Sequence, residues 1–149
     1  MQLLYFAKSW EESNLELAMT ISNIVIKNGA STPVDTTFET HLGQSGQDAP
    51  ATWYEKTAGY PAGFQPITLL VTRSKGAKPA TKVKLQVKCP KLVVADGLQT
   101  IGHTVMADVT FTLPDTAAQL ERDNILAYVT NVLANVQVKD AVKASRPAA

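Results

Sequence analysis

Seven of the chain's 14 basic residues lie between positions 73 and 91, and no acidic residue falls among them. Lys82, Lys84 and Lys88 alternate with apolar residues, so in a β-strand their side chains project from the same face. A flat basic surface of this kind suits phosphate neutralisation with local base contacts, which is how single-stranded RNA is commonly bound. The alternative is that these lysines simply occupy the solvated face of a half-buried strand. The full set is Arg73, Lys75, Lys78, Lys82, Lys84, Lys88 and Lys91.

Residues that could support catalysis or metal binding are few. The chain has one cysteine, Cys89, and two histidines, His41 and His103, far apart in the sequence. This excludes an internal disulfide and a Cys-based metal site, and no nucleophile–base pair has useful spacing. We therefore expect no enzymatic activity, no metal and no cofactor. Cys89 alternates with Val87 onto the apolar side of its strand, which predicts a buried and inert thiol.

Length and composition indicate one globular domain. The chain has 149 residues, of which 45% are apolar, and a net charge of +1; about 100–200 residues is the usual size of one domain. Its first residues lack the cleavage site of a signal peptide, and no apolar run approaches the roughly 20 residues of a membrane span. We expect a protein made in a reducing cytosol with no membrane partner.

The residues before position 114 have the pattern of antiparallel strands. Strands are predicted at 20–27, ending at Asn28-Gly29, and at 34–42 and 51–56. Three longer strands then alternate apolar with polar residues, as in a sheet with one dry and one wet face. The apolar positions are Ile67, Leu69, Val71, Val83, Leu85, Val87, Cys89, Ala107, Val109, Phe111 and Leu113. Residues 93–102 are predicted to form an exposed loop.

The apolar period changes after Pro114, which predicts a helix of about 20 residues. Thr116 and Gln119 have the spacing of a capping box. The apolar residues assigned to one helix face are Leu120, Ile125, Leu126, Val129, Val132, Leu133 and Val136. A shorter helix is predicted at 138–143. The fold class is therefore α+β, a β-meander at 19–113 followed by helices within 115–145.

One chain cannot cover its own sheet with these helices. Five strands at about 4.8 Å spacing are roughly twice as wide as one helix of about 10–12 Å. The rest of the dry face needs another chain, and a two-fold homodimer with crossed helices is the simplest closed solution. The predicted dimer interface is the apolar helix face, namely Ile125, Leu126, Val129, Val132, Leu133 and Val136.

Three segments together resemble the coat proteins of single-stranded RNA bacteriophages, the leviviruses, and are nearer the Q-beta type. They are Thr81-Lys-Val-Lys-Leu-Gln-Val-Lys-Cys-Pro90, Ala107-Asp-Val-Thr-Phe111 and the helix start Glu121-Arg122. The resemblance implies an N-terminal β-hairpin, a five-stranded sheet and two helices interlocked with those of a second copy. It also implies an icosahedral shell around genomic RNA, a maturation protein as a partner in the virion, and production in the bacterial cytoplasm.

The resemblance further implies that the sheet faces RNA and binds a hairpin at the replicase start site, which represses translation. The matching positions are Thr68, Leu70, Thr72, Lys84, Gln86, Lys88, Met106, Asp108 and Thr110, and the basic run adds Arg73 and Lys82. Met106 stands where the family often has a tyrosine that stacks on a base, and Leu70 stands where a small hydroxyl residue lines an adenine pocket. General attraction to RNA is therefore better supported than specific repression. Asp108 is also a potential ion-pair partner of Lys84 or Lys88.

Two other classes of protein share parts of this pattern. A dimeric RNA-binding regulator that never assembles would have the same basic sheet and crossed helices. A dimeric module for small ligands would need a pocket between sheet and helices, but the residues that point there are bulky and apolar. Formation of particles separates a coat protein from the regulator.

Residues 1–18 precede the part of the chain that resembles the family. Leu3, Leu4, Phe6 and Trp10 are compatible with a docking helix, but Leu15-Glu16 can be encoded by a ribosome-binding sequence just before the Met19 codon. We expect translation to begin at Met19. Mass spectrometry of protein from virus particles should then find no peptide from residues 2–18, and detection of such peptides would show that the extension is real.

Overall fold

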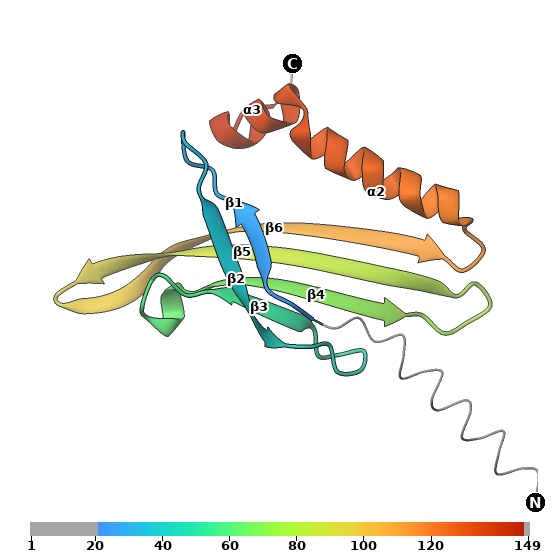
Figure 1. Cartoon of the computed structure of the whole chain (residues 1–149), viewed down its shortest axis with the longest axis horizontal. Helices are drawn as coiled ribbons and strands as arrows, with labels where there is room; N and C mark the ends of the chain where they lie inside the picture. Colours follow the sequence, from blue (N-terminus) through green and yellow to red (C-terminus); the bar gives the residue numbers. More distant parts are fainter. Residues whose placement is uncertain (1–20, 148–149) are drawn as a thin grey trace, which may run out of the picture. The chain divides into compact units, whose positions relative to one another are not determined.

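The computed structural model describes residues 21–147, and the expected α+β order of an antiparallel sheet followed by two helices is confirmed (Figure 1). The hypothetical docking helix within residues 1–18 lies outside the described residues. The strands are β1 (Ile24–Lys27), β2 (Asp35–Leu42), β3 (Ala51–Glu55), β4 (Gln65–Arg73), β5 (Ala80–Ala95) and β6 (Leu98–Pro114). A 3-10 turn, η1 (Pro61–Gly63), precedes β4, and the helices are α2 (Gln119–Ala134) and α3 (Val136–Ala144). The six strands pair in chain order, so the N-terminal hairpin continues into the sheet.

The described chain divides into two compact units. Unit 1 contains the described residues up to Leu70 together with Lys84–Val109, and unit 2 contains Val71–Val83 and the described residues from Thr110 onward. Unit 1 therefore holds the β1–β2 hairpin, β3 and the longer parts of β4, β5 and β6. Unit 2 holds the remaining strand ends and both helices. No helix within residues 21–147 has the length and apolar character needed to cross a membrane.

The predicted loop at 93–102 is wrong, because β5 continues to Ala95 and β6 begins at Leu98. Only Asp96 and Gly97 form the turn, with φ angles of 51° and 78°. Positive φ at both central residues is typical of the type I′ turn, whose twist matches that of paired strands. Neighbouring residues Val93 and Val94 are both exposed. The hairpin tip therefore has no dry face in the single chain, which is why alternation did not reveal it.

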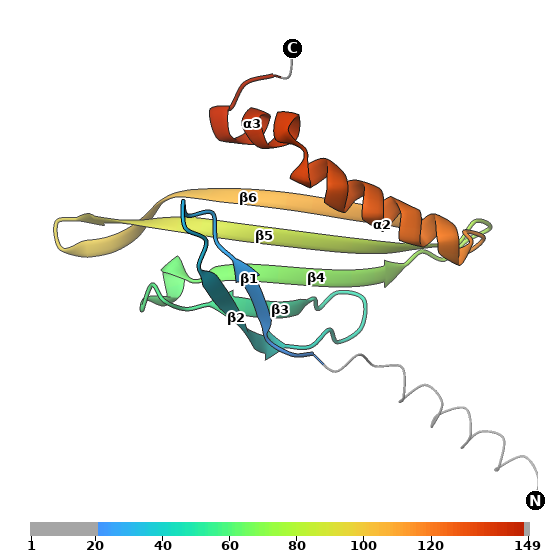
Figure 2. The same ribbon diagram turned by 45° about the horizontal axis from the view of Figure 1, so that its top comes forward.

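The buried core of unit 1 lies beneath the β1–β2 hairpin, which runs across the neighbouring strands (Figures 1 and 2). A register shift between Thr40 and Leu42 interrupts the pairing of β2 with β3. The indole Nε1 of Trp53 donates a hydrogen bond of 2.7 Å to the carbonyl oxygen of Ser22, which ties β3 to the segment before β1. The buried residues are Phe38, Ala51, Trp53 and Ile67, and Ile21, Ile24, Leu69, Leu85 and Val87 pack against them.

This core confirms that the apolar set of β4 and β5 shares one face within unit 1. Ile67 is opposite Trp53 in the β3–β4 register, and Leu85 and Val87 reach the same cluster. Cys89 follows Val87 on this side, but the prediction that its thiol is buried is wrong, since Cys89 is exposed. The buried cluster does not extend to Cys89, so nothing in the described chain covers the thiol fully.

Both helices begin at positions that differ from the predicted ones. Helix α2 begins at Gln119, where the carboxylate of Glu121 accepts a hydrogen bond of 2.7 Å from the backbone N–H of Ala118. The predicted capping box of Thr116 and Gln119 is therefore wrong by two residues. Asn135 separates the helices, and its side-chain oxygen accepts a hydrogen bond of 2.9 Å from the N–H of Gln137. Because this cap starts α3, Val136 belongs to the second helix.

One side of α2 carries an apolar stripe that the described chain leaves largely uncovered. Ile125, Leu126, Val132 and Leu133 are 42–58% exposed, and no residue of α2 is buried. At 100° per residue these four positions and half-buried Val129 share one side of the helix, whereas Leu120 lies on the other side, so its assignment to this face is wrong. We call Ile125, Leu126, Val129, Val132 and Leu133 the α2 stripe.

Replacing Phe38 by alanine should lower the free energy of unfolding by about 3–5 kcal/mol, because it leaves a cavity in the core beneath the hairpin. Val25→Ala, on the exposed side of the same hairpin, should change it by less than about 1 kcal/mol. Urea titration at one protein concentration measures both. Equal losses for the two variants would contradict the assignment of the core.

Candidate nucleic-acid interface

The face of unit 1 opposite its core carries most of the residues predicted to contact RNA. Ile67 and Leu69 pack toward the core, and so do Leu85 and Val87. Since side chains alternate along a strand, the residues between and beside them point to the other face. We call this surface of unit 1 the polar face. Its predicted RNA-contacting members are Thr68, Leu70, Lys84, Gln86, Lys88, Met106 and Asp108.

Three side chains of the polar face form a connected group across β5 and β6. Gln86 Nε2 donates a hydrogen bond of 2.6 Å to Asp108 Oδ1, and Lys84 Nζ lies 3.9 Å from the same oxygen. The expected pairing of Asp108 with Lys84 is therefore present as a long ion pair. The side chains of Lys84 and Asp108 are 53% and 38% exposed, so solvent screens the attraction and the pair contributes little to stability. An incoming phosphate can compete for Lys84.

Lys88 and Met106 complete the accessible part of this group. Within residues 21–147, Lys88 makes no ion pair, so its full charge is available to an anion. Met106 is 61% exposed and presents a thioether and methyl group rather than an aromatic ring. The polar face therefore combines an uncompensated cation, a compensated one and an apolar contact on two neighbouring strands.

The remaining predicted RNA contacts belong to unit 2. They are Thr72, Arg73, Lys82 and Thr110. The guanidinium of Arg73 makes an ion pair with the carboxylate of Asp115, which compensates its charge inside unit 2. Arg73 also alternates with Thr72, so the two side chains leave opposite sides of β4. Lys82 is exposed and makes no ion pair within the described residues.

Unit 1 also has a groove of about 930 Å³ on the hairpin side, which sequence patterns did not indicate. Phe38, Val87 and Cys89 line it together with Glu55, which is only 3% exposed. The Glu55 carboxylate accepts a hydrogen bond of 2.7 Å from the N–H of Thr57, and the Thr57 hydroxyl donates to the same oxygen. The Glu55 carboxylate is therefore hydrogen-bonded to Thr57 at the end of β3 and is not a free acid in the groove.

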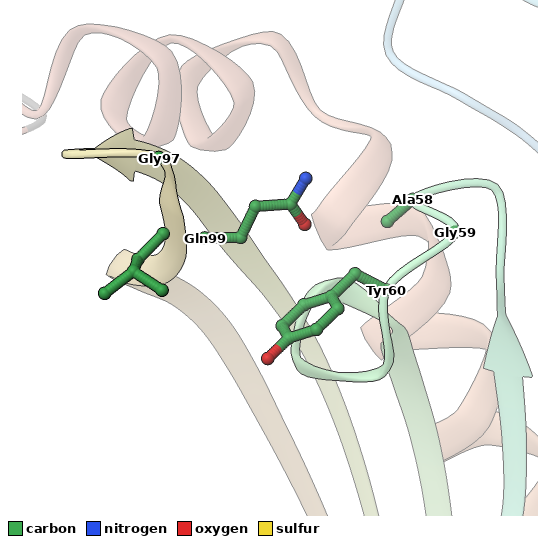
Figure 3. A pocket seen from close by; sticks show the side chains of 6 residues that line it. Ala58, Gly59, Tyr60, Gly97 and Gln99 are labelled. Carbon is green, nitrogen blue, oxygen red and sulfur yellow. The ribbon is translucent and has the colours of Figure 1, made fainter.

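A second hollow, of about 550 Å³, lies where residues 58–60 approach residues 97–99 of the β5–β6 turn. The side chains of Tyr60 and Gln99 flank this hollow in Figure 3. It contains no charged side chain. Within residues 21–147, no cluster of three His, Cys, Asp or Glu residues is arranged to bind a metal.

The chain is similar to known proteins in both sequence and structure. The profile of the family described as Levivirus coat protein matches residues 19–148. The virus-like particle of bacteriophage NT-214 is similar in structure, with 26% identity and a TM-score of 0.79 over 88% of this chain and 100% of that chain. The virus-like particle of bacteriophage ESE058 has 23% identity and a TM-score of 0.76 over 86% and 98%. The bacteriophage GA protein capsid has 19% identity and a TM-score of 0.67 over 87% and 98%. The comparison with curated protein sequences gives no match.

Proposed function

Because the chain belongs to the levivirus coat protein family, we propose that it forms the capsid of an RNA bacteriophage, assembling as homodimers into an icosahedral shell around single-stranded genomic RNA. The observation that carries this proposal is the family match over residues 19–148. Two of the similar structures cited above are described as virus-like particles, which supports self-assembly of this chain as well. The role is structural, so no catalytic step is part of the proposal.

The α2 stripe supports a dimer whose helices pack against a second copy. The predicted interface residues of α2, together with Val136 of α3, present apolar surface that the described chain leaves largely in contact with water. Apolar side chains from a second copy would cover this surface and remove it from water.

The edge of the sheet supports the same dimer. Strand β6 has 17 residues and is the last strand in the order, so one of its sides has no partner strand in the described chain. A long unpaired edge favours pairing with another chain. Antiparallel pairing of two β6 edges around a two-fold axis satisfies the backbone groups of both copies and closes the assembly at two chains.

The polar face supports binding of single-stranded RNA. Lys88 is uncompensated and Lys84 is held only by an exposed ion pair, so phosphates can approach both. Two copies related by a two-fold axis would double this basic surface. Met106 and Leu70 replace the stacking tyrosine and the small hydroxyl residue that the resemblance leads us to expect at these positions. The proposal is therefore general attraction to RNA first, and binding of a specific operator hairpin second. A maturation protein in the virion and synthesis in the bacterial cytoplasm complete the proposed setting.

Expression of residues 1–149 and 19–149 in bacteria tests the assembly. We expect closed particles that contain host RNA from the shorter chain, seen by electron microscopy and by nucleic-acid analysis of the high-molecular-weight fraction. Particles from 19–149 would also show that the first 18 residues are dispensable. Soluble dimers alone, from both chains, would rule out the capsid and favour the non-assembling RNA-binding regulator.

The double variant Lys84→Ala with Lys88→Ala should reduce the salt dependence of dimer binding to single-stranded RNA. Each neutralised phosphate contributes about 0.7 to the slope of log affinity against log salt. Loss of two contacts should therefore lower the slope by about 1 to 1.5. Filter binding over a series of salt concentrations measures this slope.

The matched control changes two exposed lysines of helix α3, as Lys139→Ala with Lys143→Ala, which removes the same net charge. The control keeps Lys84 and Lys88, so no phosphate contact on the polar face is lost. Since each such contact contributes about 0.7 to the slope, we expect the slope of the control to stay within about 0.5 of that of the unchanged protein. An unchanged slope in the Lys84 and Lys88 variant would place the phosphate contacts elsewhere.

A further inference from the structure

Three aromatic rings from separate segments of unit 1 contact one another. The His41 and Tyr54 ring centroids are 5.1 Å apart with an angle of 68° between the planes, an edge-to-face arrangement. The Tyr54 and Phe64 centroids are 6.2 Å apart with an angle of 55°. His41 comes from β2, Tyr54 from β3, and Phe64 from the residue after η1. We call this set the ring cluster.

The ring cluster lies on the side of β3 away from the core. Tyr54 stands between Trp53 and Glu55, which are 7% and 3% exposed and point toward the core side, so Tyr54 points to the opposite side. Thr52 shares that side and is directly opposite Thr68, a member of the polar face, in the β3–β4 register. The ring cluster therefore belongs to the surface that continues onto β4.

The exposure of the rings differs in a way that suits an incoming planar group. His41 is exposed, whereas Tyr54 and Phe64 are half-buried. Neither ring pair stacks face to face, since the interplanar angles are 68° and 55°, so neither contact covers the exposed His41 imidazole with a parallel ring. Edge-to-face packing of this kind stabilises a pair of rings beyond the area that it buries.

We propose that His41 is a base-stacking site for single-stranded RNA, with Tyr54 as the residue that positions it. The inference rests on the proposed function, because it assumes that RNA lies along the polar face. RNA-binding sheets and grooves commonly stack bases on aromatic side chains, since every base offers a π-face. Met106 lacks such a ring, so the ring cluster supplies the stacking surface that the β6 position does not.

The charges around the ring cluster permit this contact. Glu39 is directly opposite Tyr54 in the β2–β3 register and would repel a phosphate. Lys56 Nζ lies 2.8 Å from the Glu39 carboxylate and compensates its charge. The local environment is therefore close to neutral, so we expect contact through a base rather than through the phosphate backbone.

Replacing His41 by alanine tests the stacking separately from charge. Affinity for a single-stranded RNA oligonucleotide should fall about five- to tenfold at every salt concentration. The salt slope should stay unchanged, because no phosphate contact is lost. Against an abasic oligonucleotide of the same length, His41→Ala should bind as well as the unchanged protein. His103→Ala removes the other histidine of the chain and should have no effect on either ligand.

Variants of Tyr54 test its positioning role. Tyr54→Phe keeps the ring and should retain affinity, whereas Tyr54→Leu should lower it in the same salt-independent way as His41→Ala. Tyr128→Leu, which changes an exposed tyrosine on α2, is the control for loss of an aromatic side chain. A shifted salt slope in His41→Ala would identify a phosphate contact and overturn the stacking proposal.

The outcomes also separate this inference from the proposed function. If the unchanged protein forms RNA-filled particles and His41→Ala binds the base-containing oligonucleotide equally well, only the stacking site is refuted. If the unchanged protein neither assembles nor binds RNA, the proposed function fails and the inference fails with it.

Discussion

A sheet one layer thick has two faces, and each face must meet either water or another layer. In unit 1 the β1–β2 hairpin covers part of one face and builds the core around Phe38, Trp53 and Ile67. The packed part of this cover ends near Val87, and Cys89 lies in the groove between the hairpin and β5, where it is exposed. The incomplete cover leaves apolar surface in contact with water on one side of the sheet, and the polar face forms the other side.

The apolar surfaces that remain uncovered are those a second copy can satisfy. The α2 stripe exposes apolar area to water, and the edge of β6 leaves backbone groups without a partner strand. One symmetric partner would address both. A chain with this profile is better understood as a component of an assembly than as a self-sufficient monomer.

On the polar face, opposite charges partly compensate one another. Asp108 accepts from Gln86 and lies near Lys84, so part of the positive charge is compensated within the chain. Such exposed pairs are weak, so under the proposed function a phosphate would compete with Asp108 for Lys84. The stacking proposed for the ring cluster would add a contact of another kind, since stacking depends on the bases rather than on the charge of the backbone.

The sequence by itself determined the order of elements and the faces of β4 and β5, because alternation and helical periodicity depend on neighbouring residues. It also determined the basic run and the family resemblance. The sequence predicts a connection over residues 93–102, but not that β5 and β6 narrow it to Asp96-Gly97, since the strand ends there have no dry face in a single chain. The helix boundary at Asn135 depended on one side-chain cap. Only the tertiary structure decided that His41, Tyr54 and Phe64 meet, because the register and bend of β2, rather than any local period, bring these distant segments together.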